Sequence, residues 1–102
     1  MAETRAETVL IRQCLAGDVE AYGRLVDRYS ARVINMAYMM LGDRHESEDI
    51  AQEAFIRSYR ALGKFEKKAK FSSWLFQIAL NLCKDRLKAR SRHARSVDDD
   101  QL

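Results

Sequence analysis

A single apolar stripe that recurs every three or four residues between Gly17 and Gly42 is the feature that most constrains the fold. This interval matches the 3.6-residue turn of an α-helix, and the stripe covers about six turns. Asp18 is well placed as an N-cap, and Gly42 marks the expected helix end. We therefore predict one long amphipathic helix, whose stripe consists of Val19, Tyr22, Leu25, Val26, Tyr29, Val33, Met36, Ala37, Met40 and Leu41.

Two shorter helices flank this long one. The first is predicted over residues 3–16 and ends at Gly17 in the C′ position. The second is predicted over residues 43–62, because Asp43 and Glu46 have the spacing of a capping box. Gly63 is expected to end it by permitting a sharp turn. Its predicted inward stripe consists of Ala51, Phe55, Ser58 and Leu62.

A fourth helix is predicted after a short basic loop, residues 63–71. Ser72 or Ser73 is the expected cap, and the inward residues are Leu75, Ile78, Ala79 and Leu82. Apolar periodicity then stops, so residues 93–102 are expected to be a disordered tail beyond a frayed helix end. The chain has 102 residues and no proline, and we predict one all-α domain over residues 1–92. Its expected form is a compact bundle of about four helices.

Charge is strongly segregated along the chain, although the formal net charge is only +3. Residues 1–56 contain six lysines and arginines against ten acidic residues, whereas residues 57–95 contain twelve against Glu66 and Asp85 alone. A cluster of cations suggests a polyanionic partner, because neutralising phosphates releases counterions. A solvated basic helix face is the alternative interpretation of this half. The acidic half points to a second and different partner.

One face of the third helix is a candidate docking surface that contains Asp49, Gln52, Glu53 and Ile56. The last three follow the first by three, four and seven positions, which places all four on one side of a helix, away from the inward stripe. Carboxylates beside an amide and an apolar edge fit a basic partner helix. An ordinary exposed helix face fits the same pattern. The residues alone leave both interpretations open.

The loop between the third and fourth helices interleaves lysines with aromatic rings. Its lysines are Lys64, Lys67, Lys68 and Lys70, and its rings are Phe65 and Phe71, with Trp74 and Phe76 close behind. Cations hold a nucleic-acid backbone, and rings stack on unpaired bases at about 1–3 kcal/mol each. Core packing is the alternative for the rings, above all for Trp74 and Phe76. The pattern favours a loop that binds a single strand.

An outward row on the fourth helix continues this surface. Spaced at four, three and four residues, the row contains Gln77, Asn81, Lys84 and Lys88, with Asp85 beside it. Amides read base edges and lysines bind phosphates, although many exposed helix faces have a similar composition.

Several classes of function are disfavoured. Cys14 and Cys83 lack the spacing of a zinc knuckle or a disulfide framework, which favours two buried thiols in a reducing cytosol. His45, in the segment HESED, is interpreted as a solvated residue at a helix start, and we expect no metal and no cofactor. No nucleophile has a nearby histidine and acid, and no glycine loop cradles a phosphate, so we do not expect an enzyme. No apolar run approaches the ~20 residues of a membrane span.

Three segments occur in a fixed order: AGDVEAYGRLVDRYSARVINMAYMMLGD, SEDIAQEAFIRSYRAL and KFEKKAKFSSWLFQIALNLCKDRLKAR. Together they resemble region 2 of bacterial sigma factors, most of all the extracytoplasmic-function (ECF) group of the sigma-70 family. The resemblance covers about residues 10–92. It implies a helical promoter-recognition domain that binds core RNA polymerase and helps to melt the minus-ten promoter element in transcription initiation.

The resemblance also implies a role for each candidate surface. The acidic face docks on the clamp helices of the polymerase beta-prime subunit, through Asp49, Gln52, Glu53 and Ile56. The basic loop captures a flipped base of the non-template strand, and the last helix supports that pocket. The implied DNA contacts are Lys64, Phe65, Lys67, Lys68, Lys70, Phe71, Ser72, Ser73, Trp74, Gln77, Asn81, Lys84, Lys88 and Arg90.

Family members continue into a second helical domain, region 4, which this sequence lacks. Residues 93–102 are therefore expected to begin the interdomain linker of an excised domain or of a stand-alone region 2. The family further implies an anti-sigma factor as a partner and the cytoplasm as the location. Two other functions remain open: a helical protein-interaction module, and a generic single-stranded nucleic-acid binder that acts without polymerase. A plain nucleic-acid binder needs no acidic docking face.

Overall fold

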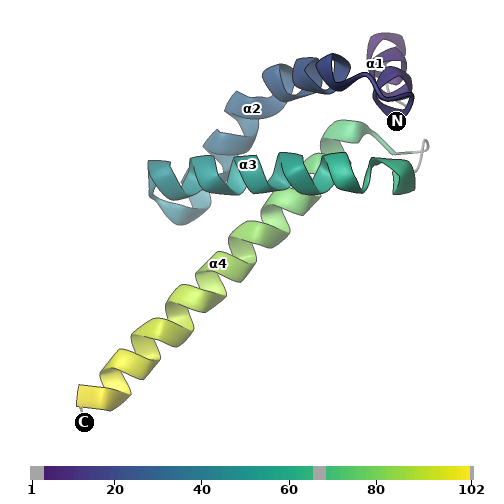
Figure 1. Ribbon diagram of the computed structural model, residues 1–102. Helices are drawn as coiled ribbons and strands as arrows, with labels where there is room; N and C mark the ends of the chain where they lie inside the picture. The colour runs from purple at the N-terminus through teal and green to yellow at the C-terminus, as the bar shows by residue number, and fades with distance from the viewer. Residues whose placement is uncertain (1–3, 66–68, 102) are drawn as a thin grey trace.

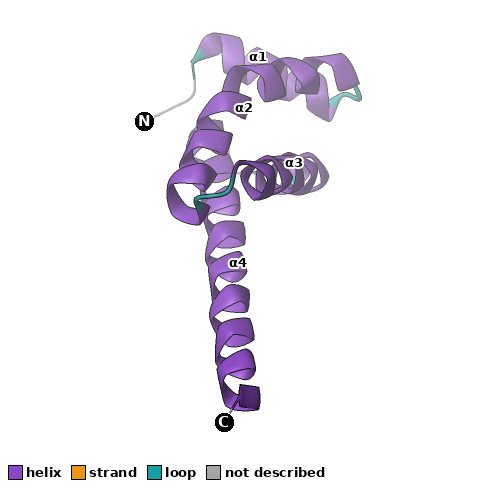
Figure 2. Ribbon diagram, turned by 90° about the vertical axis from the view of Figure 1, so that its left-hand side faces the viewer, coloured by secondary structure: helices purple, strands orange, loops and turns teal. Residues whose placement is uncertain are grey.

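The computed structural model describes residues 4–65 and 69–101, and every regular element in those ranges is helical (Figures 1 and 2). The elements are α1 (Arg5–Leu15), α2 (Val19–Leu41), α3 (Arg44–Arg60), the 3-10 helix η1 (Leu62–Lys64) and α4 (Phe71–Gln101). Helix α2 packs against each of the other three α-helices and is the centre of the fold. The predicted all-α fold of four helices is confirmed.

The N-caps predicted at Asp18 and Asp43 and the helix ends predicted at Gly17 and Gly42 are confirmed. The Asp18 carboxylate accepts a hydrogen bond from the Ala21 N–H at 3.2 Å, and Asp43 accepts one from the Glu46 N–H at 2.9 Å. Such N-caps each stabilise a helix by about 1 kcal/mol. Gly17 and Gly42 follow α1 and α2 with φ of 101° and 70°, in the left-handed region that favours glycine.

The boundaries on either side of the basic loop were predicted wrongly. Gly63 does not turn the chain through a positive φ but lies inside η1, where the Lys64 N–H donates to the Ala61 carbonyl at 2.9 Å. Helix α4 begins at Phe71, ahead of the two serines expected to cap it, because the Trp74 N–H donates to the Lys70 carbonyl at 3.2 Å. The loop is therefore shorter than residues 63–71.

Helix α4 continues to Gln101, so the disordered tail predicted over residues 93–102 is wrong for residues 93–101. No glycine or proline interrupts the chain after Gly63, and alanine, lysine and arginine favour a helix. The second half of α4 projects away from the other helices (Figure 1). The radius of gyration of 16.4 Å accordingly exceeds the ~13 Å of a compact domain of this size.

The core lies between α2, α3 and the first half of α4. The inward stripe predicted for the third helix is buried as expected: Ala51, Phe55, Ser58 and Leu62. In α4, Leu75, Ala79 and Leu82 are buried and Ile78 is partly buried. The exception on α2 is Val19, which is exposed because it is the first residue of its helix. The Tyr22 hydroxyl ties α2 to α3 through a hydrogen bond with the Ser58 hydroxyl.

Candidate functional site

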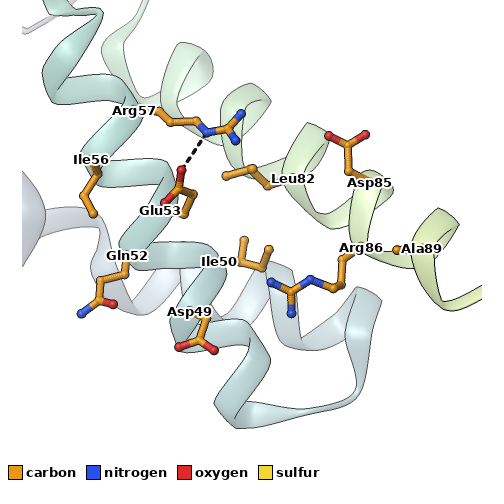
Figure 3. Close-up of a pocket in the computed structure, with 10 residues that line it drawn as sticks. All are labelled: Asp49, Ile50, Gln52, Glu53, Ile56, Arg57, Leu82, Asp85, Arg86 and Ala89. Carbon is orange, nitrogen blue, oxygen red and sulfur yellow. Dashed lines mark hydrogen bonds and ion pairs between the residues drawn. The ribbon is translucent and has the colours of Figure 1, made fainter.

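The four residues of the predicted acidic face line one groove between α3 and α4 (Figure 3). The groove has a volume of about 530 Å³, and Ile50 and Leu82 are the apolar residues of its lining that belong to the buried core. Asp49, Gln52 and Ile56 are exposed, and Glu53 is partly exposed. Their shared position on one side of α3 is as predicted.

Six residues that line the groove were not assigned to this surface by the sequence: Ile50, Arg57, Leu82, Asp85, Arg86 and Ala89. Four of them come from α4, where Asp85 is expected beside the outward row. The signal that could have found them is spacing, because Asp85 and Arg86 follow the inward Leu82 by three and four residues. The groove is thus a two-helix surface.

The groove has a net acidic character because three carboxylates line it, those of Asp49, Glu53 and Asp85, against the two guanidinium groups of Arg57 and Arg86. Arg57 donates from its Nε to Glu53 Oε1 at 3.0 Å, an exposed pair worth about 0.3–0.5 kcal/mol. Arg86 pairs with Glu46 at 3.2 Å. Among the residues the structure describes, Asp49 has no ion-pair partner. Its carboxylate is therefore available to a basic partner.

Glu46 and Arg90 form contacts between helices that the sequence did not predict. The Glu46 side chain does not complete the capping box but forms ion pairs with both Arg86 and Arg90 of α4. Arg90 also donates from Nη1 to the Leu41 carbonyl at 3.0 Å, at the end of α2. The Arg90 side chain is still 40% exposed, and its contact with a DNA phosphate stays a prediction. In the structure this side chain braces α4 against the connection between α2 and α3.

Phe71 is also misassigned as a DNA contact. Its side chain is 0% exposed and its ring lies 6.0 Å from those of Tyr29, Phe65 and Trp74, measured between ring centroids. A buried ring offers no face to an unpaired base. The core-packing alternative is correct for Phe71, and Phe65 and Trp74 are only partly buried, with their rings 5.1 Å apart.

The remaining loop residues vary in accessibility. Lys64 is exposed and Lys70 is partly buried, whereas Lys67 and Lys68 lie outside the described residues. At the start of α4, Ser72 is partly buried and Ser73 is exposed.

The outward row of α4 is solvent-facing along its whole length, and consists of Gln77, Asn81, Lys84 and Lys88. The Gln77 amide donates from Nε2 to Asn81 Oδ1 at 3.0 Å, so the two amides hold each other in register. This arrangement keeps donors and acceptors side by side, as base-edge recognition requires. The predicted row is a surface feature, and the structure brings it next to Trp74 on the same helix.

Titratable groups with shifted pKa values lie in the helix packing and not in either surface. Burial raises the pKa of the Tyr22 phenol, and its hydrogen bond with Ser58 opposes this rise. Burial likewise raises the pKa of the Cys14 and Cys83 thiols. His45 is exposed, and residues 4–65 and 69–101 contain no cluster of three potential metal ligands. No helix in those ranges is long and apolar enough to cross a membrane.

The sequence is similar to sigma factors from several bacteria. It is 46% identical over 80 residues to the ECF RNA polymerase sigma factor SigW of Bacillus subtilis, covering 78% of this chain and 43% of that protein. It is 38% identical over 104 residues to the ECF RNA polymerase sigma-E factor of Escherichia coli K12, covering 100% of this chain and 53% of that protein. The chain thus spans about half the length of these relatives.

Solved structures show the same arrangement of helices. An engineered region 2 of sigmaE in complex with GTAAAA superimposes with a TM-score of 0.76 at 39% identity, covering 83% of this chain and 88% of that one. CnrH in complex with the cytosolic domain of CnrY gives a TM-score of 0.74 at 31% identity, covering 88% of this chain and 61% of that one. The Sigma-70 region 2 family model matches residues 25–93, and the chain belongs to this family.

Proposed function

We propose that this chain is the promoter-recognition domain of an ECF-type sigma factor, which binds core RNA polymerase and captures a base of the minus-ten element. The observation that carries the proposal is the separation of two surfaces on a region 2 fold. An acidic groove lies between α3 and α4, and a basic, amide-bearing row runs along the outward face of α4. One domain therefore has one surface for a basic protein and one for a polyanion.

The acidic groove is the proposed site for the clamp helices of the beta-prime subunit. Asp49 supplies a carboxylate without an internal partner, Gln52 an exposed amide and Ile56 an exposed apolar edge. Charges of opposite sign on partner and groove speed association and select the register of docking. Glu53 joins the surface by exchanging its exposed Arg57 partner for a cation of the polymerase.

The loop and α4 are the proposed site for the non-template strand. Lysines of the loop and Lys84 and Lys88 neutralise phosphates, while Gln77 and Asn81 contact base edges. The sigmaE region 2 complex with GTAAAA supports a nucleic-acid partner for this fold. The mechanism is binding and not covalent chemistry: holding an unstacked base shifts the equilibrium from closed to open promoter. No cofactor or metal enters this mechanism.

Two further elements complete the proposal. An anti-sigma factor is a proposed regulatory partner, since the related CnrH was solved in complex with the cytosolic domain of CnrY. The cytoplasm is the proposed location, because the polymerase acts there. Residues beyond the Arg90 brace are proposed to lead toward a region 4 domain.

Fluorescence anisotropy with labelled strands of different minus-ten-like sequences tests both surfaces. The strands are titrated with and without a beta-prime clamp-helix fragment. Asp49→Arg is expected to weaken fragment binding about tenfold or more, because a like charge faces the partner's cations. Asn81→Ala is expected to weaken binding of the preferred strand about fivefold, because one contact with a base is lost.

Matched controls come from the exposed face of α2. Asp27→Arg makes the same change of charge outside the groove, and Asn35→Ala removes an exposed amide outside the row. Neither is expected to change binding by more than a general charge effect. Strand affinity that depends neither on the sequence of the strand nor on the presence of the fragment would indicate a generic nucleic-acid binder. Binding of the fragment without binding of any strand would indicate a protein-interaction module.

A further inference from the structure

Helix α1 carries a buried carboxylate that the proposed function does not use. Glu7 is 6% exposed, and burying an ionised group is costly unless it is paired and hydrogen-bonded. Its partners both come from α2: Tyr29 donates a hydrogen bond from its hydroxyl to Glu7 Oε1, and the Arg28 guanidinium lies 3.7 Å from the same oxygen. Glu7 thus attaches α1 to one point on α2.

Tyr29 connects this carboxylate to the aromatic residues of α4. The residue is 5% exposed, with its ring centroid 6.0 Å from that of Phe71 and 6.1 Å from that of Phe76. The Arg32 guanidinium lies 5.5 Å from the ring centroid, at cation–π distance. With its hydroxyl bonded to Glu7, the Tyr29 ring has a fixed position against the first turn of α4.

The contacts continue from Phe71 to both ends of the basic loop. Phe65 stands where η1 ends and the loop begins, and Phe71 and Trp74 stand where the loop ends and α4 begins. These three rings contact one another at centroid distances of 5.1–6.0 Å. Helix α1 lies at the same end of the molecule as the start of α4 in both views (Figures 1 and 2).

We propose that Glu7 and Tyr29 are positioning residues for the strand-binding loop. Their hydrogen bond fixes Phe71, and Phe71 in turn fixes Phe65 and Trp74, which hold the two ends of the loop. Neither residue contacts DNA in this proposal. They act by holding the basic loop in the position from which it and the outward row of α4 bind a flipped base. This inference rests on the proposed function, and it assigns to α1 a part in strand selection.

The test uses three variants of the full chain bound to the clamp-helix fragment. Tyr29→Phe keeps the ring and removes the hydroxyl, Glu7→Ala removes the acceptor, and Glu7→Gln keeps a neutral acceptor. Tyr29→Phe and Glu7→Ala are each expected to weaken binding of the preferred strand about fivefold. This factor corresponds to the free energy of one buried hydrogen bond. Affinity for a scrambled strand and for the fragment is expected to stay unchanged, and Glu7→Gln to retain most of the selectivity.

Tyr22→Phe is the matched control, because Tyr22 is a second buried tyrosine of α2 whose hydroxyl bonds to Ser58 of α3. It loses the hydrogen bonds of that hydroxyl with Ser58 and with the Phe55 carbonyl. Its ring stacks on Tyr59 and takes no part in the ring contacts of Phe65, Phe71 and Trp74. Trp74 is the chain's single tryptophan, so its emission reports the aromatic cluster directly. A shift of that emission is expected for Tyr29→Phe and Glu7→Ala but not for Tyr22→Phe.

Identical behaviour of Tyr29→Phe and Tyr22→Phe in strand selectivity and emission overturns the inference, since both would then act through stability alone. A wild-type chain that does not discriminate between strands instead refutes the proposed function, and with it any role in strand selection. In that case the emission of Trp74 still decides whether Glu7 and Tyr29 hold the aromatic cluster in place.

Discussion

Replacing Arg90 with alanine separates two roles for one side chain: bracing α4 and binding a DNA phosphate. The guanidinium is 40% exposed and the Glu46 carboxylate 27% exposed, so water weakens their ion pair to about 0.2–1 kcal/mol. The 3.0 Å hydrogen bond to the Leu41 carbonyl adds about 1 kcal/mol. Arg90→Ala should therefore lower the free energy of unfolding by about 1–2 kcal/mol.

For a domain of this size, each kcal/mol moves the melting temperature by about 4–8 °C, so the expected fall is on the order of 4–16 °C. Circular dichroism melting measures it, with Lys88→Ala as the matched control because Lys88 is an exposed cation of the outward row. Glu46→Gln should lose part of the same free energy, and the double variant should lose less than the sum of the two.

Salt dependence of strand binding then distinguishes the roles. The logarithm of the binding constant falls as the logarithm of the salt concentration rises. Removing one phosphate contact makes this slope less steep by about 0.7. We expect this change for Lys88→Ala and an unchanged slope for Arg90→Ala. An Arg90→Ala variant with an unchanged melting temperature and a less steep salt dependence would refute the brace and support the phosphate contact.

Two further predictions concern the helix packing. Tyr22→Phe should lower the free energy of unfolding, measured by urea denaturation, by about 1 kcal/mol, because the hydrogen bond between the Tyr22 hydroxyl and Ser58 is lost. Cys83 is fully buried and Cys14 partly exposed, so a thiol reagent should modify Cys14 first and Cys83 only on unfolding. Burial raises the pKa of Cys83 above its ordinary value of 9.0, which favours the neutral thiol in the folded state. Its contribution to stability is therefore present below pH 9 and lost as the pH rises further, and Cys83→Ala should flatten that alkaline decline in melting temperature.

Local signals account for the parts of the fold that the sequence predicted correctly. The N-caps at Asp18 and Asp43 depend on residues only three positions away, and the left-handed turn at Gly42 depends on the absence of a Cβ atom. The inward stripe of α3 follows from the helical period alone. The acidic face was predicted for the same reason, since four residues at helical spacing share a side wherever the helix packs.

Tertiary contacts account for the parts that it predicted wrongly. Phe71 belongs by sequence to a lysine-rich loop, and only the approach of Tyr29, more than forty positions earlier, buries its ring. The start of α4 at Phe71 likewise coincides with tertiary contacts, those of the Phe71 ring with Tyr29, Phe65 and Trp74. No periodicity in the loop itself distinguishes a ring that stacks on a base from one that stacks on a neighbour.

The basic residues of α4 show how one helix assigns the same charge to two tasks. Lys84 and Lys88 are four residues apart and face solvent, whereas Arg86 and Arg90 are four residues apart and contact Glu46. The two pairs are offset by two positions, which is a rotation of about 200° around a helix. Arg86 and Arg90 therefore continue the inward stripe that ends at Leu82, where a cation meets a carboxylate instead of an apolar side chain. Arg86 and Arg90 are neutralised by a carboxylate of the domain itself, whereas Lys84 and Lys88 are exposed and appear in none of the ion pairs of the described residues. The positive charge that remains available to a partner is therefore concentrated on the outward face of α4.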